Sequence, residues 1–290
     1  MDKILTLKIN TVLHGKTIKH ILKNEFGLST AIISYLKNTD DGIMLNGEKV
    51  FVTHRVCESD ELVISIHDSR SDIPETEIPL DILYEDEDII ALNKPRCMPT
   101  HPSQNHYTDT LANGLMHYFR GEAFTFRAIC RLDRNTSGIV LVAKNRLSAM
   151  LLAESMKNGN IKKEYVAVTN GAPIPDCDRI CAPIKRLKES MILRCVSPNG
   201  KEAITDYETI SVSGELAFMR LIPLTGRTHQ LRVHMSHIGT PIYGDDLYGA
   251  PQTDEPTHLH CRKIAFVHPF SKKEIVIEAP VPSDINMLIN

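Results

Sequence analysis

The sequence lacks any apolar run long enough to cross a membrane as a helix, which argues against a membrane-spanning protein. The opening residues 1–8 also lack the apolar core and the small-residue cleavage site of a signal peptide. No internal repeat or low-complexity segment interrupts the 290 residues, of which 42% are hydrophobic. We therefore expect a cytoplasmic globular protein with room for one large domain and a small one.

Cysteines spaced for a disulfide framework or a zinc site are also missing. The seven cysteines are odd in number and scattered, which fits a reducing compartment. Cys177 and Cys181 form the closest pair, but three residues separate them instead of the two of a zinc knuckle. The run His-Leu-His-Cys at residues 258–261 is more typical of alternation along a strand than of metal ligands. We therefore predict that the protein has no metal site.

An overall excess of positive charge is absent, because the formal net charge is −3, and this argues against strong non-specific binding to nucleic acid. The charges are nevertheless unevenly spread. Residues 72–88 carry eight acidic side chains and no lysine or arginine, whereas residues 127–163 carry eight basic side chains and two acidic ones. A solvated helix face explains part of the basic segment, and a polyanionic substrate explains why it surrounds the carboxylate of Asp133.

The chain is predicted to have three parts. Residues 1–68 have the pattern of a small module of two helices followed by strands, with an Asn-Gly hairpin turn at residues 46–47. Residues 69–79 are acidic, contain proline and lack periodicity, as a linker should. Residues 80–290 alternate strand-like apolar runs with helical segments, including one that Thr108 or Asp109 can cap.

Asp133 lies between two arginines, directly before a turn and a buried strand. Thr136-Ser137-Gly138 is typical of a turn, and the apolar run 139–142 is rich in β-branched residues, as a buried strand would be. Asp133 is therefore expected on a loop that a rigid scaffold holds open to a substrate. A salt bridge with Arg131 or Arg134 is the ordinary explanation of such a cluster.

Two long segments point beyond that ordinary explanation. The segment 131–138, with the sequence RLDRNTSG, resembles the signature of the RluA family of pseudouridine synthases. The segment 225–234, TGRTHQLRVH, resembles the other long signature of that family, and shorter matches include Asn93-Lys94-Pro95, although Cys97 stands where many members have glycine. The resemblance is strong over about residues 80–285.

The resemblance implies an α+β fold whose catalytic domain has a mixed, largely antiparallel sheet. It also implies an isomerase that converts uridines in structured ribosomal or transfer RNA to pseudouridine, with base flipping, without a cofactor and as a monomer. Asp133 is then the catalytic aspartate, Arg227 holds it ionised, and Tyr165 stacks on the uracil. The substrate-binding residues that the resemblance implies are Arg131, Arg134, Thr136, Lys163, His229, Gln230 and Arg232.

The N-terminal part is open to two interpretations. Residues 1–68 loosely resemble a small α/β RNA-binding module that many RluA-type enzymes share with a ribosomal protein. Their basic and acidic side chains nearly balance, however, so a plain packing module explains them about as well.

Two other functions compete with the synthase. A glycosidase-like hydrolase would pair Asp133 with a second acid such as Asp245 or Asp246, but it leaves the basic segment unexplained. An RNA-binding protein that has lost its activity would lack Asp133, Tyr165 or Arg227, and all three are present.

Overall fold

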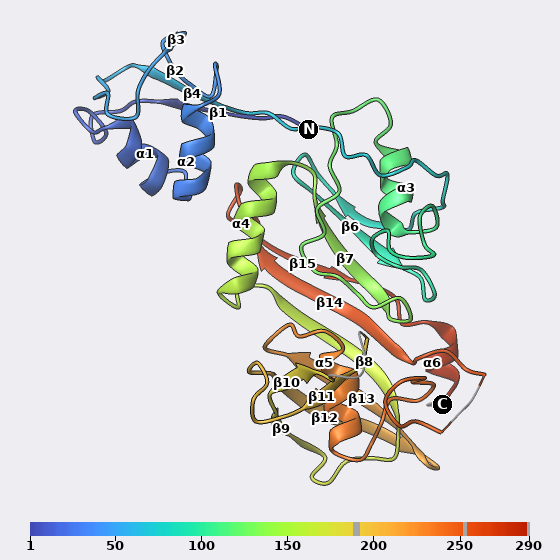
Figure 1. Cartoon of the computed structure of the whole chain (residues 1–290). Coiled ribbons are helices and arrows are strands. Elements are labelled where there is room, and N and C mark those ends of the chain that lie inside the picture. The colour runs from blue at the N-terminus through green and yellow to red at the C-terminus, as the bar shows by residue number, and fades with distance from the viewer. Residues whose placement is uncertain (188–191, 252–253, 289–290) are drawn as a thin grey trace.

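The computed structural model describes residues 1–187, 192–251 and 254–288. Its elements form a small sheet near the N-terminus, a large sheet that carries the rest of the chain, and a short two-stranded ribbon (Figure 1). In chain order the elements are β1 (Lys3–Lys8), α1 (Ile18–Asn24), α2 (Thr30–Lys37), β2 (Ile43–Leu45), β3 (Glu48–Lys49), β4 (Glu61–Ile66), β5 (Ile82–Glu85), β6 (Ile89–Lys94), α3 (Leu111–Tyr118), β7 (Ser137–Ala143), α4 (Arg146–Lys157), β8 (Lys162–Asn170), β9 (Cys177–Cys181), β10 (Ile184–Arg186), β11 (Arg194–Val196), β12 (Ile204–Ser213), β13 (Leu216–Pro223), α5 (Gln230–His237), β14 (Leu259–Val267), β15 (Glu274–Glu278) and α6 (Ser283–Met287).

The N-terminal sheet has the strand order β1-β4-β2-β3, and its apolar face packs on α1 and α2. Both helices were predicted, and each begins at a hydroxyl cap: the side chains of Thr17 and Ser29 accept backbone N–H groups one turn later. Asn46 and Gly47 have positive φ angles of 51° and 82°, which confirms the predicted hairpin turn. The sequence analysis missed β1, which pairs antiparallel with β4.

The large sheet has the strand order β5-β6-β7-β14-β8-β13-β12-β9, with β15 paired to β14. Among the described strands only β7 and β14 pair in parallel, and every other pairing is antiparallel. The predicted α+β class with a mixed, largely antiparallel sheet is therefore confirmed. All seven residues of β7 are buried, as the apolar run at 139–142 indicated.

Strand β7 starts two residues earlier than predicted, because Ser137 and Gly138 belong to the strand and not to the turn. Gly138 has φ 109°, and a Cβ atom there would lie 2.3 Å from the carbonyl oxygen of Cys261 on β14. Glycine is thus required for the close approach of the two parallel strands just after Asp133. Helix α3 is capped by Thr110, not by Thr108 or Asp109, because Thr110 and Asn113 form a reciprocal capping box.

The N-terminal sheet contacts the large one through α4 and the β5–β6 turn. Leu147 of α4 is buried in the N-terminal core, and the guanidinium of Arg146 lies 4.2 Å from the centre of the Tyr35 ring. Residues 69–81 between the two sheets contain no helix or strand. These observations support the predicted division into 1–68, 69–79 and 80–290, which stays a prediction. None of the helices in the described part of the chain is long and apolar enough to span a membrane.

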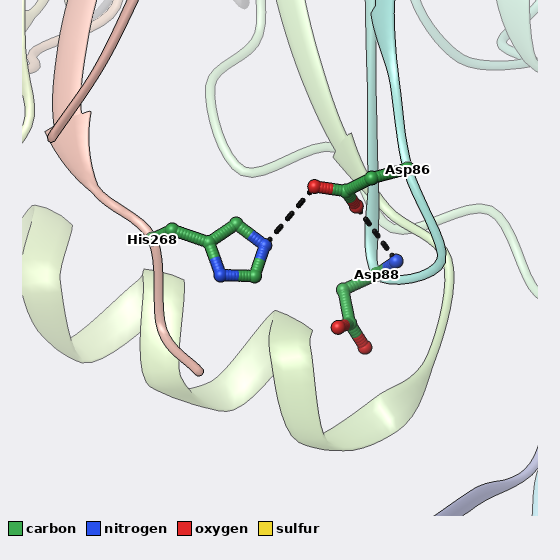
Figure 2. Close-up of side chains that lie close together, drawn as sticks. All are labelled: Asp86, Asp88 and His268. Atoms are coloured by element: carbon green, nitrogen blue, oxygen red, sulfur yellow. Dashed lines mark hydrogen bonds and ion pairs between the residues drawn. The ribbon is translucent and has the colours of Figure 1, made fainter. Parts of the chain in front are cut away.

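A polar cluster lies at this contact, formed by Asp86, Asp88 and His268 (Figure 2). Asp86 accepts the backbone N–H groups of Asp88 and Ile89, and its other oxygen lies 3.1 Å from Nε2 of His268. Asp88 accepts from the Lys3 ammonium at 2.8 Å, which ties β1 to the large sheet. Because protein donors already occupy these oxygens, the cluster works as a structural network.

Candidate active site

A cavity of about 860 Å³ opens where three loops meet. The loops are residues 99–106, 128–136 and 223–232, so the cavity brings together the two long motifs that the sequence holds about a hundred residues apart. Tyr165 of β8 contributes to the wall. Asp133 lies in the same wall, and its side chain is 29% exposed, which leaves the carboxylate accessible from the cavity.

The loop that carries Asp133 is fixed by backbone hydrogen bonds on both sides of the aspartate. Thr136 donates its N–H to the carbonyl of Asp133 at 3.1 Å, which closes a turn before β7. The buried hydroxyl of Thr100 donates to the carbonyl of Leu132 at 2.9 Å. The side chain of Asp133 is therefore presented by a rigid loop, as predicted.

Two donors face the two carboxylate oxygens of Asp133. NH1 of Arg232 lies 3.8 Å from Oδ2, and Nε2 of His229 lies 3.8 Å from Oδ1. Both distances are too long for hydrogen bonds. The arginine at this position is Arg232 and not Arg227, so the pairing predicted from the sequence is corrected.

Arg227 points elsewhere because it lies in the turn that precedes α5. Its Nε donates to the carbonyl of Glu202 at 2.7 Å, and its side chain is exposed at the rim of the cavity. Gln230 holds this turn: its Oε1 accepts from the Arg227 N–H at 3.0 Å and from the Thr225 hydroxyl at 2.7 Å. Gln230 is buried, and its side chain holds the loop in place through these hydrogen bonds.

The side chain of Arg232 is only 4% exposed. It forms ion pairs with the carboxylates of Asp245 and Asp246. Asp245, which is fully buried, accepts hydrogen bonds from Nε and Nη2 of Arg232 at 2.8 and 2.6 Å. Asp246 accepts one from Nη2 at 3.0 Å. Burial opposes the charge of Arg232, yet the Asp245 carboxylate outweighs it and raises the guanidinium pKa. The NH1 group is left to face Asp133.

Tyr165 lies on β8 and is buried, with 7% exposure. Burial, together with the thiol of Cys261 beside it, raises the pKa of Tyr165 well above its ordinary value. The phenol is therefore neutral at physiological pH. Its position in the cavity wall allows an aromatic contact with a bound base, as the resemblance implies.

The remaining predicted residues differ in how close they lie to Asp133. Arg131 and Arg134 are exposed at the cavity wall, and Nε of Arg134 lies 3.5 Å from the carbonyl of Cys97. Lys163 is half-buried in the wall near Gly226. Thr136 is buried and supports the loop through its backbone. The cavity wall thus carries the positive charges of Arg131, Arg134 and Lys163.

Sequence reasoning treated Lys94 only as part of a short motif, and the structure shows what it does. Lys94 is fully buried at the end of β6, and its ammonium donates to the carbonyls of Pro95 and Met98 at 2.8 Å and of Arg134 at 3.2 Å. It therefore ties the loop after β6 to the Asp133 loop. Burial lowers the pKa of Lys94 to about 7, and the charge of Asp133 opposes this shift.

This depressed pKa predicts how stability depends on pH. The unfolded chain keeps Lys94 protonated up to its ordinary value of 10.5, whereas the folded chain releases the proton near 7. Between these values the unfolded state binds more protons, so the contribution of Lys94 to stability rises with pH. We expect the free-energy gap between the native protein and Lys94→Met, measured by urea unfolding, to widen by about 2 kcal/mol from pH 7 to pH 9.

The comparison with Lys94→Met isolates this residue because every other titrating group is common to both proteins. The variant should also be less stable at every pH in the range, by roughly 1–3 kcal/mol, because buried carbonyls lose their donor. A gap that stays constant or narrows from pH 7 to pH 9 would show that the buried ammonium keeps its proton.

Cys97, which stands where many RluA-type proteins have glycine, lies at a position with a special backbone conformation. Cys97 has φ 61°, in the left-handed region that glycine adopts without cost. The glycine that many RluA-type proteins have at this position would suit this turn, and the cysteine accepts a strained backbone there. Its carbonyl still faces Arg134, so the turn keeps its place beside the Asp133 loop.

The geometry also bears on the hydrolase alternative. A glycosidase needs a second carboxylate free to act on the substrate. Asp245 is fully buried and is used by Arg232, while Asp246 also bonds Arg232. The two acids named as partners of Asp133 therefore serve to hold its neighbouring arginine.

Comparisons with known proteins match this arrangement. A family profile described as RNA pseudouridylate synthase matches residues 88–237, which include both long motifs. The chain is 36% identical over 272 residues to the uncharacterized RNA pseudouridine synthase YjbO of Bacillus subtilis strain 168, covering 91% of this chain and 95% of that protein. It is 34% identical over 274 residues to ribosomal large subunit pseudouridine synthase D of Escherichia coli K12, covering 86% of this chain and 82% of that protein.

A solved structure is also similar. The human protein called RNA pseudouridylate synthase domain containing 1 has a TM-score of 0.61 and 26% identity, with 75% of this chain and 90% of that chain covered. The shared architecture therefore extends over three quarters of this chain.

Proposed function

The chain belongs to the RNA pseudouridylate synthase family, and we propose that Asp133 is the residue on which its isomerisation of uridine depends. The observation that carries this proposal is the placement of the accessible Asp133 carboxylate in the cavity wall, with Arg232 and His229 facing its two oxygens. The reaction must break the bond between uracil and ribose, turn the base, and join ring carbon 5 to the sugar. An ionised carboxylate at the base and sugar can act as nucleophile or as base in these steps.

Access to Asp133 supports base flipping. The carboxylate lies within the cavity and is only 29% exposed, so a uridine stacked in a helix cannot reach it. A nucleotide that leaves its stack can enter and place its base beside Tyr165. The exposed guanidinium groups of Arg131 and Arg134 at the wall then suit phosphates on either side of the flipped nucleotide.

For the target we propose ribosomal RNA. The support is the similarity, over 86% of this chain, to an enzyme named for the large ribosomal subunit. All seven cysteines are free thiols, which supports a reducing compartment such as the cytoplasm. We propose no cofactor, since the reaction itself consumes no redox equivalent.

The test uses RNA labelled with tritium at uracil carbon 5, taken from cells that lack this protein and separated into ribosomal and transfer fractions. Formation of the new carbon–carbon bond releases that tritium to water. We expect the purified protein to release tritium from the ribosomal fraction. Release from the transfer fraction alone would refute the proposed target while leaving the reaction intact.

A further inference from the structure

Tyr248 lies behind the cavity wall and outside the set of residues that line it. The side chain is buried, with 8% exposure for the residue, and its ring packs edge-on against His229 at a centroid distance of 5.6 Å. Its hydroxyl oxygen lies 2.7 Å from Nδ1 of His229. The hydroxyl of Tyr248 therefore reaches the site through His229.

The direction of these hydrogen bonds can be worked out from the donors. The backbone N–H of Arg194 donates to the Tyr248 hydroxyl oxygen at 3.1 Å. Because that N–H takes one acceptor position of the hydroxyl, we assign the hydroxyl proton to Nδ1 of His229, which then accepts it with its lone pair. A neutral imidazole that accepts at Nδ1 carries its proton on Nε2, and Nε2 is the atom that faces Oδ1 of Asp133 at 3.8 Å.

We propose that Tyr248 is a positioning residue for the reaction: its hydroxyl fixes His229 as the neutral tautomer that presents an N–H group to Asp133. This inference rests on the proposed role of Asp133. An N–H group then faces each oxygen of the carboxylate at 3.8 Å, from Arg232 at Oδ2 and from His229 at Oδ1.

The surroundings of His229 agree with a neutral ring. Burial lowers the pKa of His229; Asp133 and Asp245 oppose this, whereas Arg232 and Arg194 lower it further. The backbone of His229 is left-handed, with φ 57°, at the position directly before α5. Its side chain makes no capping bond to the helix, so it is free to serve the site. A strained backbone kept at such a place is typical of a functional residue.

The same loop supports both donors of Asp133. Asp245 accepts the N–H of Tyr248 at 3.2 Å with the oxygen that also accepts NH2 of Arg232. The guanidinium of Arg232 in turn lies 5.2 Å from the centre of the Tyr248 ring. Residues 245–248 thus orient the histidine and the arginine together.

Two measurements on the full-length protein test the proposal. The first records two-bond proton–nitrogen correlation spectra of protein labelled at histidine nitrogen, and assigns His229 by its loss in His229→Gln. The second compares kcat and KM for tritium release between the native protein and Tyr248→Phe, which removes only the hydroxyl. The matched control is Tyr207→Phe, because Tyr207 is also buried and its hydroxyl donates to a carbonyl, that of Pro175, away from the cavity.

We expect the native spectrum to show His229 protonated at Nε2 alone, and Tyr248→Phe to lose this single tautomer. The kcat of Tyr248→Phe should fall roughly tenfold with little change in KM, because the hydrogen bond that orients His229 toward Asp133 is gone. Tyr207→Phe should change neither quantity. A native His229 that is protonated at Nδ1, or a kcat of Tyr248→Phe within twofold of native, would overturn the proposal.

The spectra need no RNA, so they separate this inference from the proposed function. If His229 has the fixed Nε2 tautomer and the native protein releases no tritium, the proposed role of Asp133 is refuted. If the native protein releases tritium and His229 has the other tautomer, the proposed role of Tyr248 is refuted.

Discussion

Asp133→Asn abolishes tritium release from uracil carbon 5, by at least about a thousandfold, because an amide can act neither as nucleophile nor as base. The fold should survive this change. The backbone carbonyl at position 133 keeps its bond from Thr136, and neither neighbour of the side chain is within hydrogen-bonding distance. The measurement is tritium release under single-turnover conditions, with urea unfolding as the check on stability.

Measuring RNA affinity separates a loss of chemistry from a loss of substrate binding in Asp133→Asn. Removing a negative charge from a cavity that receives a polyanion should leave the affinity for ribosomal RNA equal or slightly higher. Asp109→Asn is a matched control, since this exposed acid bonds the cavity residue His106 but lies away from Asp133. We expect native activity from that control. Residual turnover by Asp133→Asn within tenfold of native would assign the chemistry to another group.

The sequence sufficed to locate Asp133 and to place it before a buried strand. The resemblance of residues 131–138 to a family signature singled out Asp133, and the short polar turn followed by a β-branched run placed it before a strand. The hairpin at Asn46-Gly47 was predictable because its positive φ angles need those residues. Such features depend on neighbours in the chain.

The partner of Asp133 depends on geometry that spacing alone does not fix. Arg227 and Arg232 belong to one motif, and either could reach the aspartate if the helix began at the right residue. The chain turns left-handed at His229, so α5 begins at Gln230 and directs Arg232 toward the cavity. Tyr248 and Lys94 were missed because their roles depend on contacts across 19 and 40 residues, respectively. Strand β1 was missed because its alternating burial appears only when β4 lies beside it.

The corrected assignment predicts a large effect for Arg232. In Arg232→Met the donors that the fully buried Asp245 keeps within the described residues are the backbone N–H groups of Leu247 and Tyr248. Breaking a buried ion pair from one side should cost about 3–5 kcal/mol of stability, measured by urea unfolding. The kcat should fall by about a hundredfold or more, because Asp133 loses the positive charge that lies 3.8 Å from Oδ2.

Loss of activity through misfolding has to be separated from loss of the charge beside Asp133. The double variant Arg232→Gln with Asp245→Asn replaces the buried ion pair by a neutral one, so it should recover most of the stability and stay as inactive as Arg232→Met. Arg227→Met tests the alternative, because that side chain is exposed and its bond goes to the carbonyl of Glu202. It should unfold within about 0.5 kcal/mol of native and affect KM more than kcat. If Arg227→Met instead loses kcat while the double variant keeps it, then the resting distance of 3.8 Å between Arg232 and Asp133 does not reflect the reacting state, and Arg227 must move in when RNA binds.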